Sequence, residues 1–332
     1  MTSIAVLGTG RIGKMHAGLI ARQVEGLELT AVYDIDSASS QAVADELGCE
    51  RADSVAQILS SNVEAVAICS STDTHVDLTV AAAEAGKAIF LEKPVSLDLA
   101  QVDRAVAAVE AAGVPIHVGF NRRYDVAHAA VQAAVADGSL GDLHLLKITS
   151  RDPEPPPIDY IGVSGGMFID MTIHDFDMAR FVTGSEIVDV FTKAAVRVDP
   201  AIGDAGDVDT AIVVLTHENG CITTIDNSRQ AVYGYDQRVE AFGAAGMAVS
   251  ENPRSHTAEI HTAQGTRLEN IPYFFLQRYI PSYVAAWQAF ERGLATGVMS
   301  ISLRDGRAPL VAGLAAWKSH REGRPVQMSE IG

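Results

Sequence analysis

A lysine at the end of an apolar run is the first residue of this sequence that could do chemistry. Lys93 follows Ala88–Leu91 and stands between Glu92 and Pro94. Four apolar residues of this kind are typical of a buried strand in a parallel sheet, and ligands bind at the carboxyl edge of such sheets. Because the residue before a proline is held extended, Lys93 should be aimed at that edge. The alternative is an ordinary surface lysine.

A second candidate for chemistry is an acid and a histidine in the stretch Gly165–Asp177. Asp170 and His174 are four positions apart, so they share a face if a helix begins near Asp170. An aspartate beside a histidine orients the ring and suits a group that takes a proton near neutral pH. Alcohol oxidation needs such a base, and a lysine can hold the hydroxyl and stabilise a developing alkoxide. The alternatives are a structural or surface histidine and a helix-capping aspartate, and we expect Asp175 and Asp177 to be solvated or structural.

The elements that must position these residues begin with a glycine-rich turn. A strand over 3–7 leads into Gly8-Thr9-Gly10-Arg11-Ile12-Gly13 and then a helix over 14–22. Such glycines allow a tight turn and close approach to a pyrophosphate, which the helix N-terminus attracts. The next strand, 27–33, ends at Asp34, where a carboxylate would bind ribose hydroxyls and repel a 2′-phosphate. The pattern predicts an NAD site rather than an NADP site; the alternative is a glycine turn followed by a strand-capping acid.

Strands and helices then alternate as far as residue 118. We expect helices over 38–47, 55–59, 75–85 and 98–112, with strands over 65–69, 88–91 and 115–118. This alternation predicts a doubly wound parallel sheet, an α/β Rossmann domain. A polar turn containing Ser70, Thr72 and His75 follows the strand 65–69 and could line the cofactor, although Thr72 or Thr74 could equally cap a helix.

The periodicity changes in the second half of the chain. We expect a helix over 126–137, strands over 143–150, 187–198, 210–217, 221–228 and 237–242, and helices over 172–183 and 303–322. Consecutive strands joined by short turns predict an α+β domain with an open, mainly antiparallel sheet. The predicted domains are 1–122 and 123–332, and the sequence does not decide whether the last helix packs back on the first.

Composition excludes several classes of function. The chain has 332 residues, with 25 Lys and Arg against 42 Asp and Glu, a net charge of −17. Such a chain should repel nucleic acid and anionic membranes. Its first residues have no basic region and it has no long uncharged apolar run, so we expect a soluble, cytoplasmic protein. Cys49, Cys69 and Cys221 are far apart and indicate neither disulfides nor a metal site.

Taken together, Gly8–Gly13, Glu92-Lys93-Pro94 and Asp170-x-x-x-His174 after a glycine pair resemble the Gfo/Idh/MocA family of oxidoreductases over essentially the whole chain. The stretches 120–125 and 165–177 are most similar to those of its inositol 2-dehydrogenases, which oxidise myo-inositol to scyllo-inosose with NAD in inositol catabolism. The resemblance implies a cis peptide before Pro94 and a homotetramer built through the open sheet.

The resemblance also implies roles for individual residues. The catalytic group would be Lys93, Asp170 and His174. Cofactor ligands would include Gly8, Gly10, Gly13 and Asp34, and we add Arg11, Ile12, Ser70, Thr72, His75, Glu92 and Lys93. For the polyol we add Arg122, Asp152, Tyr160 and Tyr235, polar residues expected in loops, to the catalytic group; each could instead be a loop cap or rim residue.

Two other functions remain open at this level. Members of the family differ in substrate, so scyllo-inositol, chiro-inositol or an aldose could replace myo-inositol. A non-catalytic NAD-binding regulator could also use this fold. The joint presence of Lys93, Asp170 and His174 favours an enzyme, because a sensor needs no proton acceptor.

Overall fold

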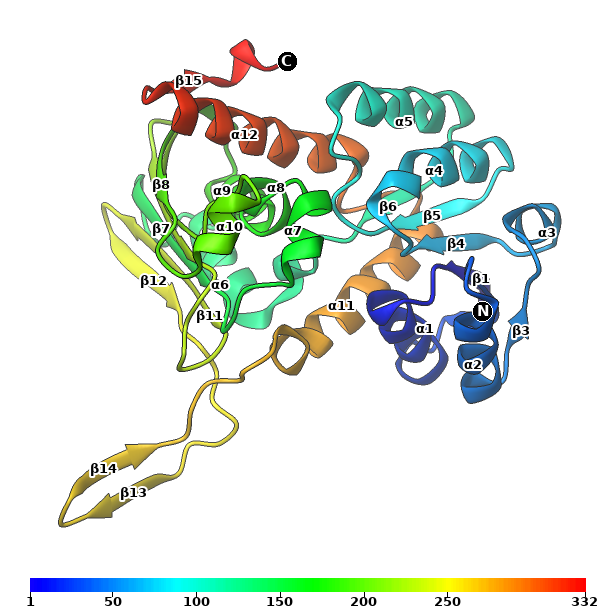
Figure 1. Cartoon of the computed structure of the whole chain (residues 1–332), viewed down its shortest axis with the longest axis horizontal. Coiled ribbons are helices and arrows are strands. Elements are labelled where there is room, and N and C mark those ends of the chain that lie inside the picture. Colours follow the sequence, from blue (N-terminus) through cyan, green and yellow to red (C-terminus); the bar gives the residue numbers. More distant parts are fainter. The chain divides into compact units, whose positions relative to one another are not determined.

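The computed structural model describes all residues from Met1 to Gly332 (Figure 1). By its internal contacts the chain divides into two compact units. Unit 1 comprises Met1–Asn121 and Pro281–Ala308, and unit 2 comprises Arg122–Ile280 and Pro309–Gly332. None of the helices is both long and apolar enough to cross a membrane.

Unit 1 is built on a parallel sheet of six strands in the order β3-β2-β1-β4-β5-β6. The strands are β1 (Thr2–Leu7), β2 (Leu27–Tyr33), β3 (Glu50–Arg51), β4 (Ala65–Ile68), β5 (Ala88–Leu91) and β6 (Ile116–Val118). The helices between them are α1 (Arg11–Gln23), α2 (Ser37–Leu47), α3 (Val55–Ser60), α4 (His75–Glu84) and α5 (Leu99–Ala112). This confirms the expected doubly wound sheet, whose order reverses between β1 and β4, where nucleotides bind in such folds.

Two further segments complete unit 1. Pro281–Thr296 of helix α11 (Phe275–Thr296) brings Trp287 into the core, where its ring stacks on Phe90 of β5 with centroids 4.0 Å apart. Leu303–Ala308, the start of helix α12 (Leu303–Glu322), also belongs here. No helix was expected over 275–296 from the sequence.

Unit 2 is built on a sheet of seven strands in the order β12-β11-β7-β10-β9-β8-β15. The strands are β7 (Leu143–Arg151), β8 (Ile187–Ala195), β9 (Thr210–His217), β10 (Ile222–Ser228), β11 (Asp236–Gly243), β12 (Gly246–Ser250) and β15 (Val326–Gln327). Only β7 and β10 pair in parallel, so the expected open, mainly antiparallel sheet is confirmed. A separate exposed hairpin consists of β13 (Glu259–Thr262) and β14 (Gly265–Leu268).

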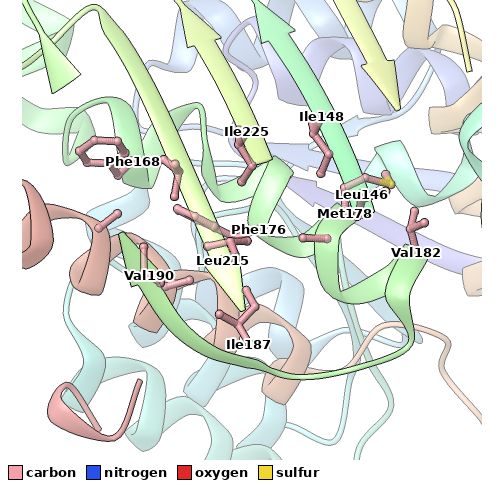
Figure 2. Packing of buried hydrophobic residues seen from close by; sticks show 14 of the residues in the cluster. Leu146, Ile148, Phe168, Phe176, Met178, Val182, Ile187, Val190, Leu215 and Ile225 are labelled. Atoms are coloured by element: carbon pink, nitrogen blue, oxygen red, sulfur yellow. The ribbon is translucent and has the colours of Figure 1, made fainter. Parts of the chain in front are cut away.

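One face of this sheet packs against helices. The helices of unit 2 are α6 (Val126–Ala136), α7 (Ile158–Ser164), α8 (Met167–Asp170), α9 (Ile173–Thr183) and α10 (Pro200–Asp204), with Pro309–Glu322 of α12. Figure 2 shows Phe176 and Met178 of α9 among sheet residues such as Ile148, Leu215 and Ile225. Phe176 is fully buried, so α9 is fixed to the sheet that carries it.

Candidate active site

The glycine turn of unit 1 has the backbone that a bound pyrophosphate requires. Gly8 has φ 96° and passes so close to the next strand end that a Cβ would lie 2.6 Å from the Ser70 backbone. A Cβ on Gly13 would lie 1.8 Å from the Gly8 carbonyl oxygen, so this glycine lets helix α1 pack on the turn. At Gly10, by contrast, a Cβ would meet no atom within 4 Å. The turn therefore presents an open cradle at the N-terminus of α1, which no side chain caps.

Asp34 is tied to this turn by hydrogen bonds. Its Oδ2 accepts from the Thr9 backbone N–H at 2.5 Å and from the Thr9 hydroxyl at 3.2 Å, and its Oδ1 accepts from the Asp36 N–H at 2.9 Å. The carboxylate is half-buried at the end of β2. The open cradle and the acid beside it fit an NAD dinucleotide, with the pyrophosphate at α1 and the ribose hydroxyls at Asp34.

The turn after β4 lies beside the same cradle. The Ser70 and Thr74 hydroxyls lie 2.6 Å apart, and Thr72 begins a single 3-10 turn. Thr74 also donates to the Ser71 carbonyl oxygen, so its hydroxyl does not cap α4. His75 is buried, with Nδ1 2.8 Å from the Pro94 carbonyl oxygen and Nε2 3.1 Å from that of Ser70. Its ring nitrogens are therefore occupied within the protein.

Lys93 follows β5, as expected, and the Lys93–Pro94 bond is cis, which confirms the expectation from the resemblance. The preceding Glu92 is buried, and its Oε2 accepts from the Lys93 backbone N–H at 3.1 Å. Its Oε1 lies 2.8 Å from Nε2 of His16, which is fully buried in α1. Glu92 therefore supports the backbone of Lys93 from inside unit 1.

In unit 2, Asp170 ends the short helix α8 and is held by two neighbours. Its Oδ1 accepts from the Tyr160 hydroxyl at 3.0 Å, and its Oδ2 lies 3.6 Å from Nη1 of Arg229. Arg229 is itself fully buried and donates to Asp207 at 3.1 Å. This ion pair places positive charge beside the Asp170 carboxylate. His174 is half-buried in the first turn of α9.

Asp170 and His174 would share a helix face only if a helix began near Asp170, and the structure does not meet this condition. Helix α8 ends at Asp170 and α9 begins at Ile173, with a turn at Met171 and Thr172. The Thr172 N–H bonds back to the Met167 carbonyl oxygen, and its buried hydroxyl donates to Asn227 Oδ1 at 2.7 Å. These bonds draw the backbone toward β10 and interrupt the helix, so the two side chains do not follow a regular helical spacing.

Buried ion pairs hold this part of unit 2 together. Arg122 is buried and donates to Asp175 at 2.8 Å, to the Ser150 hydroxyl at 3.2 Å and to the Tyr235 hydroxyl at 3.2 Å. Asp175 also accepts from the Asn227 amide at 2.8 Å. Burial raises the pKa of Asp175, which Arg122 and Asn227 oppose, and burial likewise raises the pKa of Tyr235. Of the two alternatives for Asp175, the structural one is therefore confirmed.

The remaining expected residues occupy different elements. Asp177 is buried and paired with Arg123, which again favours a structural role over a solvated one. Tyr160 is half exposed and lies in helix α7, not in a loop as expected. Asp152 is half-buried just after β7, and burial raises its pKa to about 6. Arg122 and Arg229 lower that pKa, whereas Asp170 and Asp175 raise it. Asp152 thus shares one electrostatic cluster with Asp170.

Sequence reasoning missed several residues that hold these side chains. They are His16 and Trp287 in unit 1 and Asp207, Asn227 and Arg229 in unit 2. Each of them bonds to a residue far away in the chain, so no short-range sequence pattern identifies it. The one available signal was Arg229, a single arginine in an otherwise uncharged run after Asp226.

Comparison with known proteins assigns both halves of the chain. Residues 2–120 match the GFO/IDH/MocA oxidoreductase family with its NAD-binding Rossmann fold, and residues 128–249 match the GFO/IDH/MocA C-terminal domain. The chain is 46% identical to a myo-inositol 2-dehydrogenase of Thermotoga maritima, over 99% of each chain. It is 43% identical to an inositol 2-dehydrogenase of Rhizobium meliloti, over 98% of each.

The chain is also similar to a solved structure. That structure is scyllo-inositol dehydrogenase from Lactobacillus casei with bound NAD(H) and scyllo-inositol, which is 26% identical to this chain. The two superimpose with a TM-score of 0.92 over 99% of each chain. With its glycine cradle, its Asp34 and the match of both halves, this chain belongs to the GFO/IDH/MocA family of NAD-binding oxidoreductases.

Proposed function

We propose that the protein is an NAD-dependent inositol 2-dehydrogenase that oxidises myo-inositol to scyllo-inosose. The observation that carries this is the 46% identity, over 99% of each chain, to a myo-inositol 2-dehydrogenase. The glycine cradle and Asp34 support NAD as the cofactor, because a carboxylate repels a 2′-phosphate. NAD, when bound, accepts the hydride that leaves the alcohol carbon.

Three residues are proposed to act on the reacting hydroxyl group. Lys93 donates a hydrogen bond to the hydroxyl oxygen and stabilises its negative charge as the proton leaves. His174, as a neutral imidazole, takes that proton. Asp170 orients the base, and its own carboxylate is held by Tyr160 and Arg229. A base that must be neutral makes kcat/KM for inositol rise with pH and level off in the alkaline range.

Further polar residues of unit 2 are proposed to recognise the polyol. A cyclitol presents hydroxyl groups around a ring and needs several donors and acceptors. Tyr160 and Asp152 are at least partly exposed and can hydrogen-bond a substrate directly. Arg122 and Tyr235 are buried and bonded to each other, so they are proposed to contribute mainly by fixing the wall of the pocket.

The cellular location and the oligomeric state of the enzyme are also proposed here. The net charge of −17 and three unpaired cysteines support a cytoplasmic enzyme of inositol catabolism that binds neither nucleic acid nor membranes. The exposed apolar residues on the open sheet of unit 2 support a homotetramer assembled through that face.

The direct test measures NADH absorbance with a panel of myo-, scyllo- and chiro-inositol and an aldose, each with NAD and with NADP. We expect the highest kcat/KM for myo-inositol with NAD. Lys93→Met should lower kcat about 10²- to 10³-fold while NAD affinity stays within about a few fold. Arg321→Met, which changes an exposed basic residue near the end of α12, is the control and should keep full activity.

Three other results would change the proposed substrate, the proposed class of protein or the proposed role of Lys93. A clear preference for scyllo-inositol would place the chain with the Lactobacillus casei enzyme in substrate. NAD binding without turnover of any substrate would favour a regulatory protein instead. Retention by Lys93→Met of more than about a tenth of the wild-type kcat would remove Lys93 from the catalytic group.

A further inference from the structure

Behind Lys93 lies a chain of buried hydrogen bonds that the proposed reaction does not use directly. The Trp287 indole Nε1 lies 2.9 Å from His16 Nδ1, and His16 Nε2 lies 2.8 Å from Glu92 Oε1. The other carboxylate oxygen of Glu92 accepts from the Lys93 backbone N–H at 3.1 Å. Trp287 and His16 are 0% exposed and Glu92 is 7% exposed. Four groups from α11, α1 and the end of β5 thus form one connected line inside unit 1.

The Trp287 indole fixes which atom is the donor in each hydrogen bond of this line. An indole N–H can only donate, so His16 Nδ1 must be the acceptor and carries no hydrogen. The hydrogen of the neutral ring is therefore on Nε2, which donates to Glu92 Oε1. One edge of the carboxylate is then held by His16 and the other receives the Lys93 N–H. Trp287 sets the tautomer, and the tautomer sets the position of Glu92.

A second buried histidine supports the opposite side of Lys93. His75 Nδ1 lies 2.8 Å from the carbonyl oxygen of Pro94, and the ring is 2% exposed. Both neighbours of Lys93 in the chain are therefore bonded to buried imidazoles, Glu92 to His16 and Pro94 to His75. The residues on both sides of Lys93 are therefore held by buried imidazoles, which limits where its side chain can start.

A purely structural role would not explain why polar side chains fill this part of the core of unit 1. The His16 ring packs among Phe90, Tyr283 and Trp287, with centroids 5.3 to 5.5 Å away, a place that an apolar side chain could fill. Burying a carboxylate and an imidazole costs free energy unless each is hydrogen-bonded. The line ends at the backbone of Lys93, so that residue is what the buried polar groups hold.

We propose that His16 is a positioning residue for Lys93, that it acts through Glu92, and that Trp287 selects its working tautomer. This proposal rests on the proposed function, in which Lys93 binds the reacting hydroxyl. Misplacement of a catalytic group by about 1 Å can cost about 10²-fold in rate. Loss of the line should therefore lower kcat and leave NAD affinity nearly unchanged.

The test compares substitutions that remove or keep the donor to Glu92. His16→Leu removes it and should lower kcat about 10- to 10²-fold. His16→Gln can place an amide N–H near the position of Nε2 and should recover most of that loss. Trp287→Phe keeps an aromatic ring on Phe90 but frees the tautomer, and it should give an intermediate kcat. The control is Phe290→Leu, which trims a buried ring of the same aromatic cluster.

Two spectroscopic signals separate positioning from loss of packing. Nitrogen NMR of the histidine rings should show hydrogen on Nε2 of His16 in the wild type and a mixture of tautomers in Trp287→Phe. The backbone amide signal of Lys93, observed with lysine-selective labelling, should move in His16→Leu and in Trp287→Phe but not in Phe290→Leu. These signals are read without turnover, so they test the line even if no inositol is oxidised.

Two results would overturn the proposal. One is an equal loss of kcat in His16→Leu, His16→Gln and Phe290→Leu, which would mean that only packing matters. The other is a Lys93 amide signal that stays in place when His16 or Trp287 is changed. If His16→Leu does not fold, His16→Gln and Trp287→Phe alone decide between these outcomes. Absence of turnover in the wild type, with the amide shifts as expected, would contradict the proposed function and leave the hydrogen-bonded line intact.

Discussion

Asp152 ionises close to neutral pH because burial disfavours its charged form. Burial raises its pKa to about 6, against the two cations Arg122 and Arg229 and with the help of Asp170 and Asp175. An acid whose pKa is higher in the folded than in the unfolded protein binds more protons when folded between the two values. The stability that protonated Asp152 contributes is present at low pH and is lost as the pH rises through about 6.

The substitution Asp152→Asn removes this ionisation. The difference in unfolding free energy, variant minus wild type, should increase between about pH 4 and pH 7 and then level off. Urea unfolding at several pH values and one protein concentration measures it. Asp159→Asn, an exposed aspartate of the adjacent helix α7, controls for the change in net charge. A difference for Asp152→Asn that does not vary with pH would contradict the raised pKa.

At the scale of single residues, the sequence could identify those that belong to a motif of neighbouring positions in the chain. Asp34 and Lys93 each end a strand and follow a recognisable motif, so their places in unit 1 could be predicted. His16 could not, because its partner Glu92 is 76 positions away. Asp175 was recognised only as one of two alternatives, because nothing in its neighbourhood reveals the buried Arg122 53 positions before it.

The interruption between α8 and α9 is the element that places Asp170 and His174, the proposed catalytic pair of unit 2. Thr172 is fully buried, and its hydroxyl lies 2.7 Å from Asn227 Oδ1 and 3.2 Å from the Met167 carbonyl oxygen. A valine has nearly the same shape but cannot donate, so it leaves the Asn227 oxygen without that hydrogen bond. Such a loss costs about 1–3 kcal/mol of stability.

Thr172→Val should therefore destabilise the protein and also lower kcat, because the turn that orients Asp170 and His174 is free to shift. Thermal unfolding and steady-state kinetics measure the two effects. Thr183→Val is the matched control: its hydroxyl donates to Ala179 at 2.7 Å near the far end of α9, so only stability should fall. If both variants keep full kcat, the turn does not position the base.

The elements themselves could be predicted where periodicity is strong. Five of the six parallel strands of unit 1 were expected to within about a residue, because apolar runs alternate with helical segments, but the two-residue strand β3 was not expected. The helix break at Thr172 could not be predicted, since the bond that causes it reaches 55 positions along the chain. Helix α11 was also missed; Pro281, which lies inside it, is a residue that normally interrupts helices.

At the scale of the whole molecule, the proposed tetramer requires a surface that the monomer leaves uncovered. The sheet of unit 2 packs one face on its helices, and its other face carries a row of apolar residues on neighbouring strands. Met247 pairs with Phe242, Phe242 with Leu145, and Leu145 with Ile222. Their exposed fractions lie between 41% and 56%. A contiguous apolar row of this kind is typical of a protein–protein interface.

Charges placed in this row should break the assembly. Leu145→Lys and Phe242→Glu each put a charge where a second copy would exclude water, and an unpaired buried charge is strongly unfavourable. Sedimentation velocity and light scattering should show a tetramer for the wild type and smaller species for both variants. Val298→Lys, at another exposed apolar position that is 74% exposed, should remain tetrameric. Because opposite charges can pair, the mixture of Leu145→Lys with Phe242→Glu should partly restore the tetramer if the rows of two copies meet. A wild-type monomer, or tetramers for both charged variants, would contradict assembly through this face.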